Sequence, residues 1–154
     1  MEQLPSLVRM SNWDLLYSLN KDGTSIGTFY ERCKKVRTTL LVVQDTKGWV
    51  FGGYCTEAWH PATRFYGTGE NFIFTFKTGN KPIIYRWTGE TDQFQWGNEK
   101  SIGIGGGQLG RFAIFLQENF YKGSSAKSSA FNNEILSSDT DFICTALEVW
   151  GFDY

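Results

Sequence analysis

The chain has 154 residues, of which 41% are hydrophobic, 17% aromatic and 20% charged, and its formal net charge is −1 at pH 7. Without an excess of positive charge it lacks the electrostatic signature of a nucleic-acid-binding protein. No run of about 18 apolar residues could span a bilayer, and the start lacks the basic segment and apolar stretch of a secretory signal. We therefore expect a soluble, intracellular protein with one hydrophobic core.

The N-terminal part of the chain predicts one strand and one or two helices. Pro5 precedes a short apolar stretch, as at the start of a helix. Residues 13–19 read as a strand that ends in a turn of Asn, Lys, Asp and Gly. A second helix, capped by Thr24 or Ser25, is expected to end near Lys34. Its apolar face is formed by residues spaced three and four apart, namely Ile26, Phe29, Tyr30 and Cys33.

The middle of the chain has the period of strands and predicts two hairpins. Residues 40–44 and 49–55 are rich in β-formers, and the Asp-Thr-Lys-Gly sequence between them is typical of a hairpin turn. Residues 71–76 and 83–87 form the second pair, separated by a turn with Gly, Asn and Pro. In the first strand of that pair the alternate residues Phe72, Phe74 and Phe76 share one face.

The remaining strands are short and separated by turn residues. We predict strands at 94–96, 101–104, 111–116 and 142–150, and a loop over the serine-rich residues 122–129. This spacing favours a mainly β fold with short helices (α+β), in which two antiparallel sheets pack as a sandwich flanked by short α-helices.

Residues 23–27 match the GxSxG pattern of a nucleophile elbow around Ser25, with Asp45 and His60 downstream in the order that α/β-hydrolases use. The pattern follows a turn, however, whereas the elbow needs a buried parallel strand before it. His60 is the only histidine and precedes a proline in a predicted loop. We interpret Ser25 as a helix cap and His60 as a solvent-facing side chain.

Residues 105–110 match GxGxxG, the pattern of a dinucleotide-binding turn. That motif binds pyrophosphate because a helix N-terminus follows it, but residues 111–116 predict a strand. We interpret the glycines as a bend or bulge where the backbone passes close to a neighbour, or as an exposed docking loop.

The three cysteines, Cys33, Cys55 and Cys144, have neither a redox nor a zinc spacing and are expected to be free, buried thiols. Glu70 and Glu148 lie in apolar strand regions, where a carboxylate needs a hydrogen-bonding partner.

No metal site is predicted, because the acidic residues near the C-terminus lack the glycine and the spacing of a calcium loop. These residues are Glu134, Asp139 and Asp141.

Several segments, taken in order, resemble the TLDc domain of the oxidation-resistance protein family over about residues 4–152. They are LLYS (15–18), DGTS (22–25), VFG (50–52), FYGTGE (65–70), WTG (87–89), GGG (105–107), FNN (131–133) and LEVW (147–150). The resemblance implies a single TLDc domain over 1–154, with an N-terminal part upstream of Leu4 that is short or absent.

The resemblance implies a sandwich of antiparallel sheets and a role in oxidative stress resistance through binding of the vacuolar proton-pumping ATPase, whose assembly such proteins affect. The expected adaptor is non-catalytic, binds no cofactor or metal, and lies in the cytoplasm or at endolysosomal membranes through the pump. The residues expected to contact the partner or to shape the contacting loops are Gly67, Gly69, Glu70, Gly103, Gly105, Gly106 and Gly107. The alternative is a hydrolase or redox-active enzyme with a site near Ser25, His60 and Glu70.

The chain departs from the family pattern at four positions. Ser128 stands where a cysteine is usual and Ala130 where a threonine is usual, so direct scavenging by a thiol in this loop is not expected. Phe115 and Gln117 replace a more usual tryptophan and aspartate, so no acid role is expected at that strand.

Overall fold

The computed structural model describes residues 12–107 and 110–153, so the helix expected at Pro5 lies outside the described residues. The elements are β1 (Asn12–Ser18), α2 (Leu19–Asp22), α3 (Ile26–Cys33), β2 (Thr39–Asp45), β3 (Val50–Cys55), β4 (Phe72–Lys77), β5 (Ile83–Arg86), β6 (Gln95–Gly97), β7 (Ile102–Gly106), β8 (Phe112–Leu116), the 3-10 turn η2 (Glu118–Phe120), β9 (Lys122–Ser124) and β10 (Asp141–Asp153).

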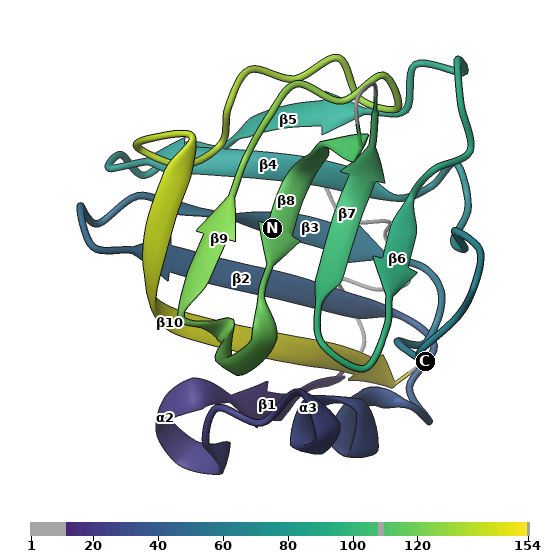
Figure 1. Ribbon diagram of the computed structural model, residues 1–154, viewed down its shortest axis with the longest axis vertical. Helices are drawn as coiled ribbons and strands as arrows, with labels where there is room; N and C mark the ends of the chain where they lie inside the picture. Colours follow the sequence, from purple (N-terminus) through teal and green to yellow (C-terminus); the bar gives the residue numbers. More distant parts are fainter. Residues whose placement is uncertain (1–11, 108–109, 154) are drawn as a thin grey trace.

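The strands form two antiparallel sheets that share β10. Sheet A contains β5, β4, β3, β2, β10 and β1, and sheet B contains β6, β7, β8, β9 and the start of β10. In Figure 1 the strands of sheet B run across those of sheet A, and the two helices lie beside β1 at one end. The register of β10 against β2 shifts between Cys144 and Ala146, next to the point where the strand passes from one sheet to the other. The predicted sandwich of antiparallel sheets with short helices is confirmed.

The main core fills the space between the sheets, and α3 closes one end of it. Ser25 caps this helix, because its Oγ accepts a hydrogen bond from the backbone N–H of Thr28 at 3.3 Å. Phe29, on the apolar face of the helix, packs against the rings of Tyr17 and Trp59. The helix predicted from the spacing of apolar residues is therefore present and buries the predicted face.

Sheet A is apolar on both faces. Ile73 joins the main core, whereas Phe72 and Phe74, on the opposite face of β4, belong to a second buried cluster with Leu40 and Tyr54. The shared face predicted for the alternating phenylalanines of this strand is confirmed.

Two short segments differ from the sequence prediction. The turn expected after β1 is the one-turn helix α2, which ends where the N–H of Gly23 donates to the carbonyl of Leu19. The serine-rich segment expected to be a loop begins with β9, which pairs with both β8 and β10. Hydrogen bonds to two neighbouring strands outweigh the weak β-propensity of Lys, Gly and Ser, and a single sequence does not reveal such partners.

Asp45, at the end of β2, ties the first hairpin to the loop before β10. It is only 2% exposed, and its carboxylate accepts hydrogen bonds from the backbone N–H groups of Lys47 and Trp49 and from the N–H and Oγ of Ser138. Four donors satisfy this buried carboxylate, as its desolvation requires.

Replacing Asp45 by alanine leaves these donors without their partner. We expect Asp45→Ala to lower the free energy of unfolding by roughly 3 kcal/mol, because buried donors lose a charged acceptor. Urea unfolding measures the change, with the exposed Asp14→Ala as the matched control, which should differ from wild type by less than about 0.5 kcal/mol. Equal stability of the two variants would show that Asp45 does not anchor the hairpin.

Candidate functional site

The residues of the catalytic alternative are separate in the structure. Ser25 is an exposed helix cap, and the ring of His60 stacks on Tyr66 with centroids 4.2 Å apart, its Nδ1 lying 3.1 Å from the carbonyl oxygen of Pro61. Glu70 is exposed. Within residues 12–107 and 110–153, no hydrogen bond or ion pair joins any two of the side chains of Ser25, His60 and Glu70. Asp45 belongs to the hairpin described above.

The three thiols are buried in the core, as expected from their sequence context. Burial raises the pKa of Cys33 and of Cys144 to about 12, and burial also raises the pKa of Cys55. A thiol reacts as its thiolate. At physiological pH these groups are therefore protonated as well as shielded from solvent.

The GxGxxG glycines lie in and just after strand β7, and the strand β8 follows them. The backbone N–H of Gly105 donates to the carbonyl of Phe94, and that of Gly106 donates to the carbonyl of Gln93. Gly105 has φ +72°, and a Cβ there would lie 3.0 Å from both Phe131 and Ser128. The predicted bend with close backbone approach is confirmed, and the amides of Gly105 and Gly106 already have carbonyl partners.

Three loops gather around the end of β7. We call these three loops (residues 65–70, 87–93 and 126–132), together with residues 105–107 at the end of β7, the loop cluster. The hydroxyl of Ser128 donates to the carbonyl of Gly106, and Thr88 donates from its N–H to the carbonyl of Ala130 and from its hydroxyl to that of Ser129. Segments far apart in the sequence therefore meet at one end of the sandwich, beyond the labelled tip of β7 in Figure 1.

A buried polar network holds the 65–70 loop in place. The amide side chains of Asn71 and Gln95 hydrogen-bond to each other at 3.1 Å, and both are at most 1% exposed. Gln95 also donates to the carbonyl of Glu57, whose carboxylate accepts from the backbone N–H of Gly67. Fully partnered networks of this kind fix one conformation, so the loop is a rigid part of the surface.

Trp87 packs on the same loop from the outside. A Cβ on Gly69 would lie 2.4 Å from the Trp87 ring, so only glycine fits beneath it. The Trp87 side chain is 44% exposed, and its Nε1 donates to the carbonyl of Thr91 at 2.6 Å. The indole therefore presents a flat apolar face to solvent in a fixed orientation.

The residues expected to contact the partner differ in their exposure to solvent. Gly103, Gly105 and Gly106 are buried, whereas Gly69 and Glu70 are exposed and Gly67 and Gly107 are half-buried. Gly105 and Gly106 can shape the loop cluster but are shielded from a partner, and Gly103 lies within sheet B, paired with Trp96 and Phe115. From the sequence, Trp87 was not singled out as an exposed ring of the loop cluster, although an aromatic residue beside a turn glycine was a usable signal.

Other positions singled out in the sequence have structural partners. Ser128 is 1% exposed, and its Oγ accepts from the N–H of Ala130 while donating to Gly106. Glu148 accepts a hydrogen bond from the indole N–H of Trp150 at 3.1 Å, the kind of partner expected for it.

The part of the chain that the structure describes contains neither a candidate metal site nor a candidate membrane-spanning helix. No group of three or more His, Cys, Asp or Glu side chains there could hold a metal ion. No helix in that part has both the length and the hydropathy needed to cross a membrane.

Comparisons with known proteins match the whole chain. The sequence profile described as "TLDc domain" matches residues 1–153. Human "Nuclear receptor coactivator 7" is 40% identical over 152 residues, which are 98% of this chain and 16% of that protein. Rat "Oxidation resistance protein 1" is 37% identical over 142 residues, 92% of this chain and 17% of that protein. The chain therefore spans about a sixth of the length of these relatives.

The cost in stability of crowding around Gly105 can be measured separately from the cost of its positive φ. Gly48, in the first hairpin turn, also has positive φ (+83°) but has open space around its Cβ position. We expect Gly48→Ala to cost about 1 kcal/mol from left-handed strain alone, and Gly105→Ala roughly 3 kcal/mol because contacts with Phe131 and Ser128 add to it. Urea unfolding of both variants checks this, and equal losses would contradict the packing described here.

The thiols should react only when the protein unfolds. We expect native protein between about pH 7 and 9 to react with a chromogenic disulfide far more slowly than urea-unfolded protein, whose thiols have a pKa of about 8.5. Because burial raises the folded-state pKa values, the thiols favour the folded state below pH of about 8.5. This contribution is lost as the pH rises towards 12. Rapid, stoichiometric labelling of the native protein would contradict it.

Proposed function

The chain belongs to the TLDc domain family, and from this premise we propose that it acts by binding a protein partner, the vacuolar proton-pumping ATPase. In this proposal it is a non-catalytic module of oxidative stress resistance that affects assembly of the pump. It works in the cytoplasm and is peripheral on endolysosomal membranes through the pump. The pump as partner follows from the resemblance of the motifs, and the oxidation-resistance role follows from the matching relatives.

The observation that carries the proposal is the convergence of the family motifs in the loop cluster. Three of the segments that resemble the family, residues 65–70, 87–89 and 105–107, lie together there. They are held by backbone hydrogen bonds and by the Asn71–Gln95 network. A rigid surface loses little conformational entropy when it binds, which favours recognition of a large partner.

The exposed groups of the loop cluster are suited to a protein interface. Trp87 offers a large ring of the kind found at energetic centres of interfaces. Glu70 and Glu90 are exposed acids and Lys127 an exposed base, all within the loop cluster. Charged groups at the rim of an aromatic anchor provide orientation and specificity.

The separation of the candidate catalytic groups weakens the enzymatic alternative. A nucleophile and its base act within hydrogen-bonding reach of each other, whereas Ser25 caps a helix and His60 stacks on Tyr66. The thiols are buried with raised pKa values, which weakens the redox alternative.

Trp87 provides the test of the proposed surface. We expect Trp87→Ala to reduce recovery of the vacuolar ATPase in a pull-down by about fivefold or more, because it removes an aromatic anchor. Trp13→Ala is the matched control, since Trp13 is similarly exposed (36%) but lies on β1 in sheet A, and it should recover the pump as wild type does. Thermal unfolding of both variants checks that they are folded.

Two outcomes would contradict the proposal at different levels. Equal recovery by folded Trp87→Ala and Trp13→Ala would remove the loop cluster from the interface. Failure of the wild-type protein to recover the pump would remove the pump as the partner.

A separate measurement tests the hydrolase alternative. Incubation with a broad fluorophosphonate probe should leave Ser25 unmodified, because its hydroxyl forms no hydrogen bond with a basic or acidic side chain among the described residues. Labelling of the wild type that Ser25→Ala abolishes would overturn the non-catalytic proposal.

A further inference from the structure

The outer face of sheet B carries a row of aligned residues that the proposed loop cluster does not use. The strand registers place Asp141 beside Ser124, Ser124 beside Phe115, Phe115 beside Gly103, and Gly103 beside Trp96, so the row crosses all five strands. Apart from Gly103, its members are exposed or half-buried. The adjacent row, which faces the core, is entirely buried and consists of Phe142, Gly123, Leu116, Ile102 and Gly97.

Aromatic rings cover most of this outer row. Gly103 has no side chain, and the ring of Phe112 occupies the space, since a Cβ on Gly103 would lie 2.8 Å from it. Phe112 stacks on Phe115 with centroids 5.4 Å apart and also contacts Trp96 at 5.5 Å. Phe65 of the loop cluster lies 5.9 Å from Phe112, so the aromatic surface continues the loop cluster.

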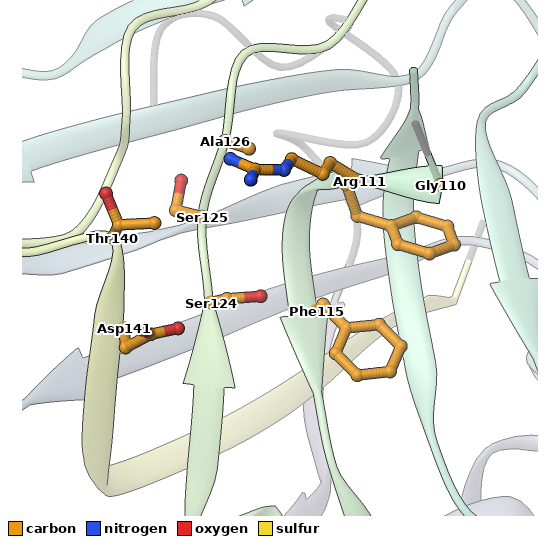
Figure 2. A pocket seen from close by; sticks show the side chains of 9 residues that line it. Gly110, Arg111, Phe115, Ser124, Ser125, Ala126, Thr140 and Asp141 are labelled. Carbon is orange, nitrogen blue, oxygen red and sulfur yellow. The ribbon is translucent and has the colours of Figure 1, made fainter. Parts of the chain in front are cut away.

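Beside these rings is a hollow of about 320 Å³, which we call the sheet B hollow. Figure 2 shows Arg111 with its guanidinium near Ser125 and Ala126, while Asp141 and Ser124 lie further along the strands with their oxygens directed toward the side of Phe115. The remaining lining residues are Gly110, Phe112 and Thr140.

The charges of the hollow have no partner of their own among the described residues. Neither the carboxylate of Asp141 nor the guanidinium of Arg111 forms an ion pair or hydrogen bond within residues 12–107 and 110–153. The lining combines the carboxylate of Asp141 with the rings of Phe112 and Phe115. The faces of such rings carry partial negative charge and attract cations. The chain itself uses such contacts elsewhere, where Lys77 lies over the ring of Trp49 at 5.7 Å.

We propose that the sheet B hollow is a docking pocket for a basic side chain, an arginine or a lysine, presented by the partner protein next to an acidic residue. The cation enters against Phe115 and pairs with Asp141, and the neighbouring acid pairs with Arg111. A basic residue with an acidic neighbour complements both unpaired charges, whereas an anion alone would pair with Arg111 only and would lie near the carboxylate of Asp141. The inference rests on the proposed binding of a protein partner, to which it adds a second contact surface beside the loop cluster.

The chemistry of the pocket can be tested without the partner. In an NMR titration of the whole chain, N-acetyl-arginine amide should shift the amide signals of Phe115, Ser124 and Asp141 in a saturable way. Asp141→Asn and Phe115→Leu should each raise the dissociation constant by about fivefold or more. The first removes the carboxylate that pairs with the cation, and the second removes the aromatic ring against which the cation lies. Phe115→Tyr, which keeps the ring, and Glu99→Gln, the same charge change on the exposed β6–β7 turn, should bind as wild type does.

An uncharged and an anionic control ligand test whether binding requires a positive charge. N-acetyl-norleucine amide has no charge and should give no saturable shift. Saturation by the norleucine ligand, tighter binding of N-acetyl-glutamate amide than of the arginine ligand, or unchanged arginine binding by Asp141→Asn would each overturn the proposal.

The same variants then separate this inference from the proposed function. In the pump pull-down, Asp141→Asn and Phe115→Leu should recover less ATPase than Glu99→Gln and Phe115→Tyr. If all four recover the pump as wild type does while Trp87→Ala fails, the second surface is refuted and the loop cluster stands. If the wild type recovers no pump, the proposed partner fails, and the arginine titration still decides whether the pocket binds a basic side chain.

Discussion

The pairing of β10 with both sheets is the constraint on which the rest of the structure depends. Its first three residues hydrogen-bond to β9, and the following residues pair with β2 and β1. Because one continuous strand belongs to both sheets, the sheets cannot separate without breaking one of its ladders, and their inner faces enclose the core. The ends of β4, β5, β6 and β7 are thereby brought close enough for their loops to meet.

Packing of aromatic rings on glycine residues shapes the surface of sheet B and of the loop cluster. Rings lie directly over Gly69 and Gly103, and the space beside Gly105 is filled by Phe131 and Ser128. Each of these contacts brings a side chain closer to the backbone than a Cβ would allow. Glycine thus admits the Trp87 ring on Gly69 in the loop cluster and the Phe112 ring on Gly103 on the outer face of sheet B.

The two proposed binding surfaces arise from different features of the fold. In the loop cluster the backbone is fixed by hydrogen bonds between loops, and Trp87 projects from it. On sheet B the strand register aligns an acid, a hydroxyl and aromatic rings in one row. Both present aromatic groups on rigid backbone, which supports binding. The side chains of the hydrolase alternative form no hydrogen bond with one another among the described residues, and Ser25 caps a helix while His60 stacks on Tyr66.

The sequence by itself determined the β-rich fold class, the capped helix at Ser25 and most strand positions, because apolar periodicity and turn residues are local properties. It also determined that a strand follows the glycine run. Only the tertiary structure decided that Lys122–Ser124 is a strand, that Gly105 is buried while Glu70 is exposed, and that Asp141 shares a row with Trp96. These features depend on pairing and packing between residues distant in the chain, which local sequence patterns alone do not specify.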